Sequence, residues 1–385
     1  MKNLRCMQVG WILVLAVVVL GVTFMTPALA SNNTARHTNQ AQTAQRAASS
    51  SLNAIVYLTT GSLASTFQNK INQQIPNAVN TAIVNMVSTL PKQDQGWATE
   101  MATTLIQPSA ALMNLAPQQG GLVMALRLSL YPGDPKAITS SILIKFNVLN
   151  ASTVQVSASP MNGGPSLVNG PLTTFQMPLG SLNSINSTPG CGDAALALNL
   201  QFPVTLGQAS SQVQSHIANI SMTGMNQLTA NLGAKKLDAG NVNSFIEVPA
   251  ASLSSVSSSI GSMPVSGSFT AKNIRITVQG SNIHILSDIY WGGLNIGTAD
   301  TAASPSAAGG NLLLHVLSTN LSIFGLFSFP INNYNQQIEQ TLNSKLGTAF
   351  AGKFYVDQAE IGPNSLLPCA ASDSLVLTGN ISVLG

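Results

Sequence analysis

The sequence predicts an α+β protein made of amphipathic helices and antiparallel β-sheets. Apolar residues recur every three or four positions over residues 63–90 and 331–350, as in helices that bury one face. Between and after these stretches the apolar residues alternate with a period of two, which is typical of half-buried strands. Few helices separate the strands, which disfavours a parallel sheet with crossover helices.

The composition narrows the classes of partner. The chain has 385 residues, of which 45% are apolar and 7% charged, whereas soluble domains carry roughly 25% charged residues. Its net charge is +3, from 15 basic and 12 acidic residues, which is too small to attract a nucleic-acid backbone. We therefore expect no nucleic-acid partner, and an apolar surplus that must be buried or used for binding.

The N-terminus predicts export. Lys2 and Arg5 precede an apolar run over residues 11–22, and Ala28-Leu29-Ala30 matches the small-residue pattern of a signal-peptidase site. We expect a signal peptide over residues 1–30, cleavage near Ala30, and a secreted or extracytoplasmic protein. An uncleaved anchor is the alternative, although the run is shorter than the roughly 20 residues that span a bilayer. Residues 31–50 contain no large apolar side chain and predict a flexible leader.

The first half of the mature chain begins as helix and continues as sheet. The helical spacing over residues 63–90 includes Phe67 and Ile71, and Pro76 should kink or split this helix. A second helical stretch is expected over residues 97–115. Strands follow at 122–130, 142–148, 154–158 and 196–206, with residues 159–193 as a loop rich in Gly, Pro, Asn and Ser.

The second half repeats this alternation less regularly. Strands are expected at 245–248, 268–278, 283–290 and 312–321, with a polar loop at 300–311. A helix should begin at Pro330 and run to Phe350, and strands at 353–361 and 375–383 close the chain. We interpret residues 51–385 as one α+β domain, with two halves, 51–206 and 207–385, that resemble a diverged repeat.

The cysteines predict one disulfide. Removal of the signal peptide also removes Cys6, so Cys191 and Cys369 remain in a chain bound for an oxidising compartment. A bridge between them would close a loop of about 180 residues, for which chain entropy gives on the order of 5 kcal/mol. The alternative is two unrelated buried thiols.

Motifs for catalysis are absent from the sequence. It contains no G-x-S-x-G, S-x-x-K, H-E-x-x-H, P-loop or EF-hand pattern. Residues 190–195 resemble the start of a dinucleotide-binding fingerprint, but an alternating strand follows them instead of a helix. The four histidines show no metal-ligand spacing, and Asp357 and Glu360 are expected to be exposed on an edge strand. We expect no enzyme, cofactor or metal, while a site assembled from distant residues stays open.

The C-terminal part of the chain resembles a known family. The order of features is a short strand leading into Pro249-Ala250-Ala251, the strands near Phe269 and Ile283, the helix from Tyr334, and a final strand ending in Leu375-Val376-Leu377-Thr378-Gly379. Over about 140 residues this order is similar to bacterial secreted phospholipid-binding proteins related to the tubular lipid-binding (TULIP) superfamily. The resemblance implies a TULIP-like fold, in which long amphipathic helices pack against a highly curved antiparallel sheet. It also implies an apolar cavity for phospholipid, without a cofactor.

These observations lead to a functional hypothesis. We expect an exported, non-catalytic lipid carrier whose partners are phospholipid or another amphiphile and, transiently, a membrane surface. A cell-surface structural or adhesive β-rich protein is the alternative. The residues expected to line the apolar interior are Phe67, Ile71, Leu196, Leu198, Leu200, Phe202, Ile338, Leu342 and Leu346.

Overall fold

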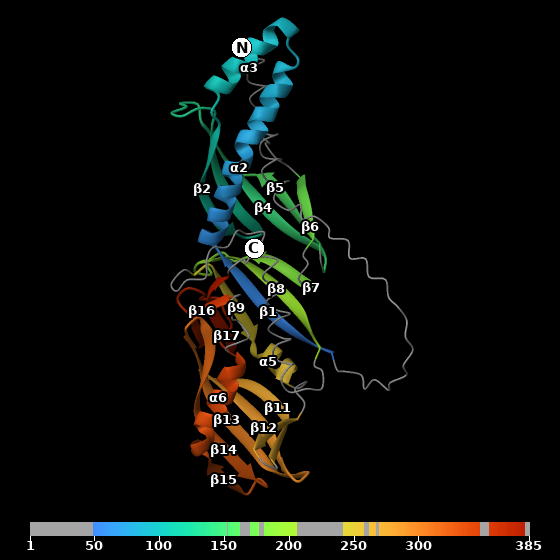
Figure 1. Ribbon diagram of the computed structural model, residues 1–385, viewed down its shortest axis with the longest axis vertical. Helices are drawn as coiled ribbons and strands as arrows, with labels where there is room; N and C mark the ends of the chain where they lie inside the picture. Colours follow the sequence, from blue (N-terminus) through green and yellow to red (C-terminus); the bar gives the residue numbers. More distant parts are fainter. Residues whose placement is uncertain are drawn as a thin grey trace, which may run out of the picture.

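The computed structural model describes residues 49–151, 153–161, 170–176, 181–205, 242–257, 262–266, 269–346 and 354–381. The predicted signal peptide and almost all of the predicted leader lie outside these residues. The molecule is elongated, and three antiparallel sheets follow one another along its long axis (Figure 1). We call them the upper, central and lower sheets.

The central sheet combines strands from both halves of the chain. Its order is β16-β17-β9-β1-β8-β7, so the strands of the second half lie on one side of the β9/β1 pair and those of the first half on the other. Its strands are β1 (Ser49–Thr59), β7 (Ser181–Ser187), β8 (Ala194–Thr205), β9 (Ser244–Pro249), β16 (Phe354–Ile361) and β17 (Ser374–Ile381).

The upper sheet is a five-stranded meander in which each strand pairs with the next along the chain. The alternation around residue 122 places Leu122, Met124 and Leu126 on its buried face, as the sequence predicts. Its strands are β2 (Ser109–Gln118), β3 (Gly121–Ser129), β4 (Ile138–Asn150), β5 (Thr153–Pro160) and β6 (Gly170–Gln176).

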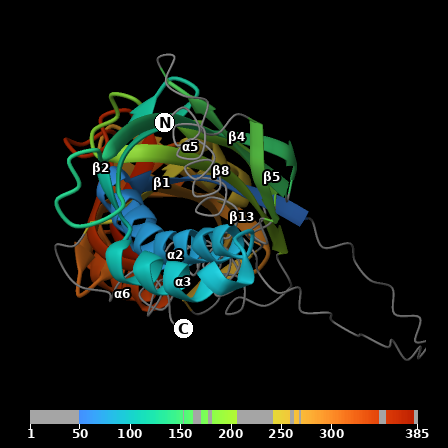
Figure 2. The same cartoon turned by 90° about the horizontal axis from the view of Figure 1, so that it is seen from above.

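Two helices form a hairpin at the upper end of the molecule. Helix α2 (Thr60–Val87) follows β1 directly, and Thr59 caps it by accepting a hydrogen bond from the Ser62 N–H. Pro76 lies inside α2, and the chain stays helical on both sides of it. The predicted split of this helix at Pro76 is therefore wrong. Helix α3 (Lys92–Leu105) runs beside α2 (Figure 2) and contains no buried residue.

The lower sheet is a six-stranded meander. Helix α5 (Ala250–Ser257) connects the central sheet to it, and a short 3₁₀ helix, η2 (Asn332–Tyr334), leads into α6 (Asn335–Leu346), which packs against β14. Its strands are β10 (Met263–Ser266), β11 (Phe269–Gln279), β12 (Asn282–Trp291), β13 (Leu294–Ala308), β14 (Asn311–Ile323) and β15 (Phe327–Pro330).

Helix side chains complete the free edges of the outer sheets. On β2, the Gln68 side chain of α2 accepts from the Leu112 N–H at 2.6 Å and donates to the Ala110 carbonyl at 3.0 Å. On β14, Asn343 of α6 makes the corresponding pair of bonds with the N–H and C=O of Leu314, at 2.8 and 3.0 Å. Side-chain amides thus take the place of a neighbouring strand along part of β2, the edge strand of the upper sheet, and along the part of β14 that β15 does not pair.

The core of the described residues consists of one large cluster, a smaller cluster on the central sheet, and a third, of Ala271, Ile289 and Ala299, in the lower sheet. The main hydrophobic cluster contains buried residues of all three sheets and of α2. A smaller cluster includes Tyr57, Phe245 and Leu367, and residues 362–373 contribute to it. Cys191 and Cys369 form the predicted disulfide beside this cluster, which excludes the alternative of two unrelated thiols.

The expected TULIP-like fold, with long amphipathic helices against one highly curved sheet, is wrong. Strand accounts for 58% and helix for 21% of the structure, which makes it a mostly antiparallel β protein with three sheets. Residues expected as loops are strands: β6 and β7 lie within 159–193, and most of the loop at 300–311 belongs to β13. The expected helix over 97–115 ends at Leu105, and β2 takes its second part.

The composition of these segments explains why they were expected to be loops. β7 and β13 are rich in Ser, Asn, Thr and Ala, whose alternation gives little contrast between apolar and polar positions. Their backbones are nevertheless paired with neighbouring strands along most of their length. Tertiary pairing therefore decided the structure of segments whose composition resembled loops.

Candidate functional site

The residues predicted to line an apolar interior lie in, or pack against, the main core where their side chains are described. Leu196, Leu198 and Leu200 occupy successive inward positions of β8 and are at most 4% exposed, and Ile71 of α2 is 1% exposed. Phe67 and Ile338 are partly buried and pack against the same cluster. Phe202 lies in β8, and Leu342 and Leu346 in α6, but their side chains lie outside the described residues.

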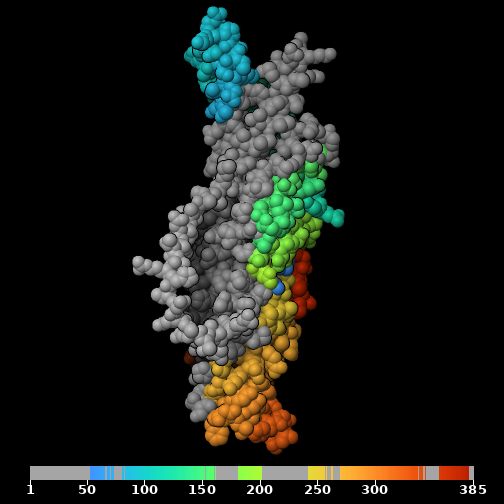
Figure 3. Space-filling model, turned by 90° about the vertical axis from the view of Figure 1, so that its right-hand side faces the viewer, coloured from blue at the N-terminus to red at the C-terminus, as the bar shows by residue number. Residues whose placement is uncertain are grey.

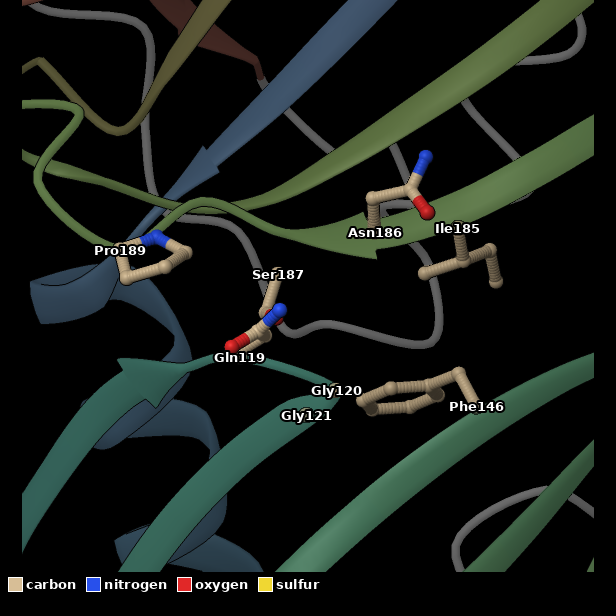
Figure 4. Close-up of a pocket in the computed structure, with 8 residues that line it drawn as sticks. All are labelled: Gln119, Gly120, Gly121, Phe146, Ile185, Asn186, Ser187 and Pro189. Carbon is tan, nitrogen blue, oxygen red and sulfur yellow. The ribbon is translucent and has the colours of Figure 1, made fainter.

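A pocket lies at the junction of the upper and central sheets (Figure 4). Its volume is about 360 Å³, within the range of small-molecule sites. The β2–β3 turn, β4, the end of β7 and the segment after it contribute its lining residues, which are Gln119, Gly120, Gly121, Phe146, Ile185, Asn186, Ser187 and Pro189. None of these eight residues had been predicted as a site residue.

Glycines and one hydrogen bond fix the entrance of the pocket. Gly120 has a φ of +86°, which a glycine adopts without strain, and a Cβ on Gly121 would collide with the Ile144 carbonyl. The Ser187 hydroxyl donates to the Gln118 carbonyl at 2.5 Å, which ties the end of β7 to the β2–β3 turn. The Ser187 hydrogen bond therefore joins the upper and central sheets at the pocket.

The pocket combines apolar and uncharged polar lining residues. Phe146 of β4 and Ile185 of β7 face the gap from opposite sides, while the Asn186 amide points away from Phe146 (Figure 4). Both apolar side chains are partly buried and pack against the main core. No lining residue carries a charge. Such a site favours an uncharged, apolar group and offers no proton donor for acid–base chemistry.

A buried polar pair lies on the small-cluster side of the central sheet. The Tyr57 hydroxyl donates to Glu247 Oε2 at 2.6 Å, and the Ala371 N–H donates to Glu247 Oε1 at 2.8 Å. Burial raises the pKa of Tyr57 well above its ordinary value, and the hydrogen bond to Glu247 and the charge of that carboxylate add to the shift. Since both Glu247 oxygens hold a structural group, we assign this pair to the fold.

The two described histidines, His284 and His315, each lie beside one carboxylate. His284 Nδ1 of β12 lies 3.0 Å from Asp300 of β13, and His315 Nδ1 of β14 lies 2.9 Å from Glu339 of α6. Within the described ranges, no three His, Cys, Asp or Glu side chains come together as metal ligands. Residues 190–193, which resemble a nucleotide motif, form turns before strand β8 and not a helix start.

Comparisons with known proteins do not assign the chain to a family. No protein-family model matches the chain, and no curated protein matches it significantly. Among the described helices, none combines the length and the apolar character that a membrane crossing requires.

Proposed function

We propose that this protein is an exported, non-catalytic lipid-binding protein that holds the apolar part of a phospholipid or similar amphiphile. One observation carries the proposal: the pocket between the upper and central sheets is uncharged, and two of its lining residues, Phe146 and Ile185, pack against the main core. An acyl chain needs no directed chemistry, because each buried CH₂ contributes about 0.8 kcal/mol.

The polar rim suits the remainder of an amphiphile. Gln119 and Asn186 lie at the exposed margin of the pocket, where amide groups can hydrogen-bond to ester or headgroup oxygens. The headgroup would then stay in water while the chain contacts Phe146 and Ile185. The disulfide agrees with export, since such bonds persist in oxidising compartments.

A pocket-filling substitution tests the proposal. Ile185→Trp adds bulk to a partly buried wall, and Leu149→Trp is the matched control on an exposed position of β4 outside the pocket. Native mass spectrometry with solvent extraction should detect a stoichiometric phospholipid on the wild-type protein and on the control. At least tenfold less should remain on Ile185→Trp.

The opposite result is equally clear. A wild-type protein that is free of lipid, and stays so after incubation with phospholipid vesicles, would refute the proposal. It would favour the cell-surface structural or adhesive role.

A further inference from the structure

Large apolar side chains are exposed together at the free end of the lower sheet. We call them the apolar tip: Phe269, Trp291, Leu294, Phe324, Leu326 and Phe327, which are 40%, 57%, 62%, 63%, 76% and 62% exposed. Strand pairing brings them to one end, because Phe269 pairs with Trp291, Trp291 with Leu294, and Ile323 with Phe327. This end forms one extremity of the molecule, opposite the α2–α3 hairpin (Figures 1 and 3).

Tight turns hold the tip in place. Gly292 and Gly293 have φ values of +56° and +89° between Trp291 and Leu294, as expected for a two-residue hairpin turn. Phe324 also has a positive φ, +51°, in the turn after β14, where Gly or Asn would fit without strain. The fold thus keeps a bulky aromatic residue in an unfavourable backbone conformation and exposes it to solvent, which points to a binding role.

The apolar tip carries no charge. The nearest charged residues lie farther along β11 and β12 and include basic and acidic side chains. Residues 289–299 and 316–338 contain no Asp, Glu, Lys or Arg. The first charged side chains are Lys272, Arg275 and Asp288, and Lys272 lies roughly 10 Å behind Phe269 at ~3.4 Å per residue. Lys272 lies over the Tyr290 ring at 4.4 Å, and Arg275 lies 3.9 Å from Asp288.

An irregularity in β11 places both cations on one face. Lys272 pairs with Asp288 and Arg275 with Leu286, so three steps on β11 match two on β12. Because residues two apart on β12 share a face, Lys272 and Arg275 lie on the same face, together with Tyr290.

This arrangement fits a zwitterionic bilayer. Apolar side chains at a membrane surface enter by about 5–10 Å, and the mixed charges behind the tip would then lie at the level of the phosphate and ammonium groups. Aromatic residues such as Trp291 and Tyr290 favour the same interface. A stable protein interface needs about 20–30 residues a side. The tip offers only six large side chains at a narrow end, whereas a fluid bilayer needs no matching shape.

We infer that the apolar tip inserts into the interface of zwitterionic phospholipid bilayers and docks the protein end-on. The docking is independent of the pocket between the upper and central sheets. It depends on apolar burial more than on charge attraction.

A single-tryptophan protein tests this inference. Full-length protein with Trp11→Phe and Trp97→Phe keeps Trp291 as its only tryptophan. With phosphatidylcholine vesicles, Trp291 fluorescence should shift to the blue and be quenched by bromine-labelled chains, equally in 0.1 M and about 1 M salt. Adding Phe324→Asn and Leu326→Asn should weaken binding more than tenfold. The matched change of Met101→Asn and Leu105→Asn, two exposed residues of α3, should not.

Several results would overturn the inference. These are no shift with phosphatidylcholine, a shift only with anionic lipid that is lost in high salt, or equal loss in both double variants. A Trp291 shift that depends on protein concentration without vesicles would assign the tip to contacts between copies. Lipid found in the pocket without docking would refute the tip alone, and docking without co-purified lipid would refute the pocket alone.

Discussion

At the scale of single residues, the buried contact between Tyr57 and Glu247 is the best-defined polar interaction of the core. The two side chains are 5% and 3% exposed and their oxygens are 2.6 Å apart. The carboxylate also holds the backbone N–H of Ala371, in the segment that covers one side of the central sheet. One acidic side chain therefore joins β1, β9 and a segment near the C-terminus.

Tyr57→Phe should lower the free energy of unfolding by about 1–3 kcal/mol, because one buried Glu247 oxygen loses its donor. Urea unfolding at pH 7 measures this difference. Tyr334→Phe, at an exposed tyrosine, is the matched control and should change little. An unchanged midpoint in Tyr57→Phe would show that water replaces the hydroxyl.

At alkaline pH, the stability of the wild type should fall more steeply than that of Tyr57→Phe. The folded protein has the higher Tyr57 pKa, so above about pH 10 the unfolded chain binds fewer protons and stability falls as pH rises. Below pH 10 this contribution of Tyr57 is fully present. Tyr57→Phe lacks this group, and its stability should decline less above pH 10 in otherwise identical unfolding experiments. Parallel declines would contradict the assignment.

At the scale of elements, both halves of the chain contain a helix whose side-chain amide hydrogen-bonds to the backbone of a neighbouring strand. Gln68 and Asn343 each satisfy one backbone N–H and one carbonyl that no strand pairs. These bonds cover part of the edge strand β2 and the part of β14 that β15 leaves unpaired.

Asn343→Leu keeps the size of the side chain but removes both hydrogen bonds to Leu314. We expect a loss of about 1–3 kcal/mol in the free energy of unfolding, since a partly buried backbone pair stays unsatisfied. Gln340→Leu, on an exposed position of the same helix, should stay within about 0.5 kcal/mol. Thermal or urea unfolding compares them, and equal effects would mean that the Asn343 hydrogen bonds do not stabilise the fold.

Sequence patterns predicted some helices and strands correctly and missed others. The strands around Leu122 and Leu196 and the helix containing Ile71 were predicted because large apolar residues mark their buried positions. Strands β7 and β13 were missed, since pairing and not side-chain contrast defines them. The pocket was missed for a related reason: Phe146 and Ile185 meet only when two sheets are joined, and Ile185 lies in a segment expected to be a loop.

At the scale of the whole molecule, the disulfide joins segments far apart in sequence. Cys191 and Cys369 are 178 positions apart and lie in the segments that precede β8 and β17. These two strands flank the β1/β9 pair from opposite sides of the central sheet. The bond therefore fixes the first half of the chain to the second.

Replacing both cysteines by alanine should lower the free energy of unfolding by about 2–5 kcal/mol, mainly by freeing the unfolded chain. The change is measured by urea unfolding of the double variant against the oxidised wild type. Added reductant should destabilise the wild type and leave the double variant unchanged. If the reductant affected both equally, the stabilisation would have another origin.

The strand order of the central sheet also affects how the chain folds during its synthesis. Synthesis from the N-terminus completes β1 and β8 before β9 exists, so β1 has one edge without a partner until residues 244–249 follow. An identical strand from a second, finished chain can fill that edge with the same register. High local concentrations of newly made protein should therefore favour dimers that exchange their C-terminal halves across the β1/β9 pair.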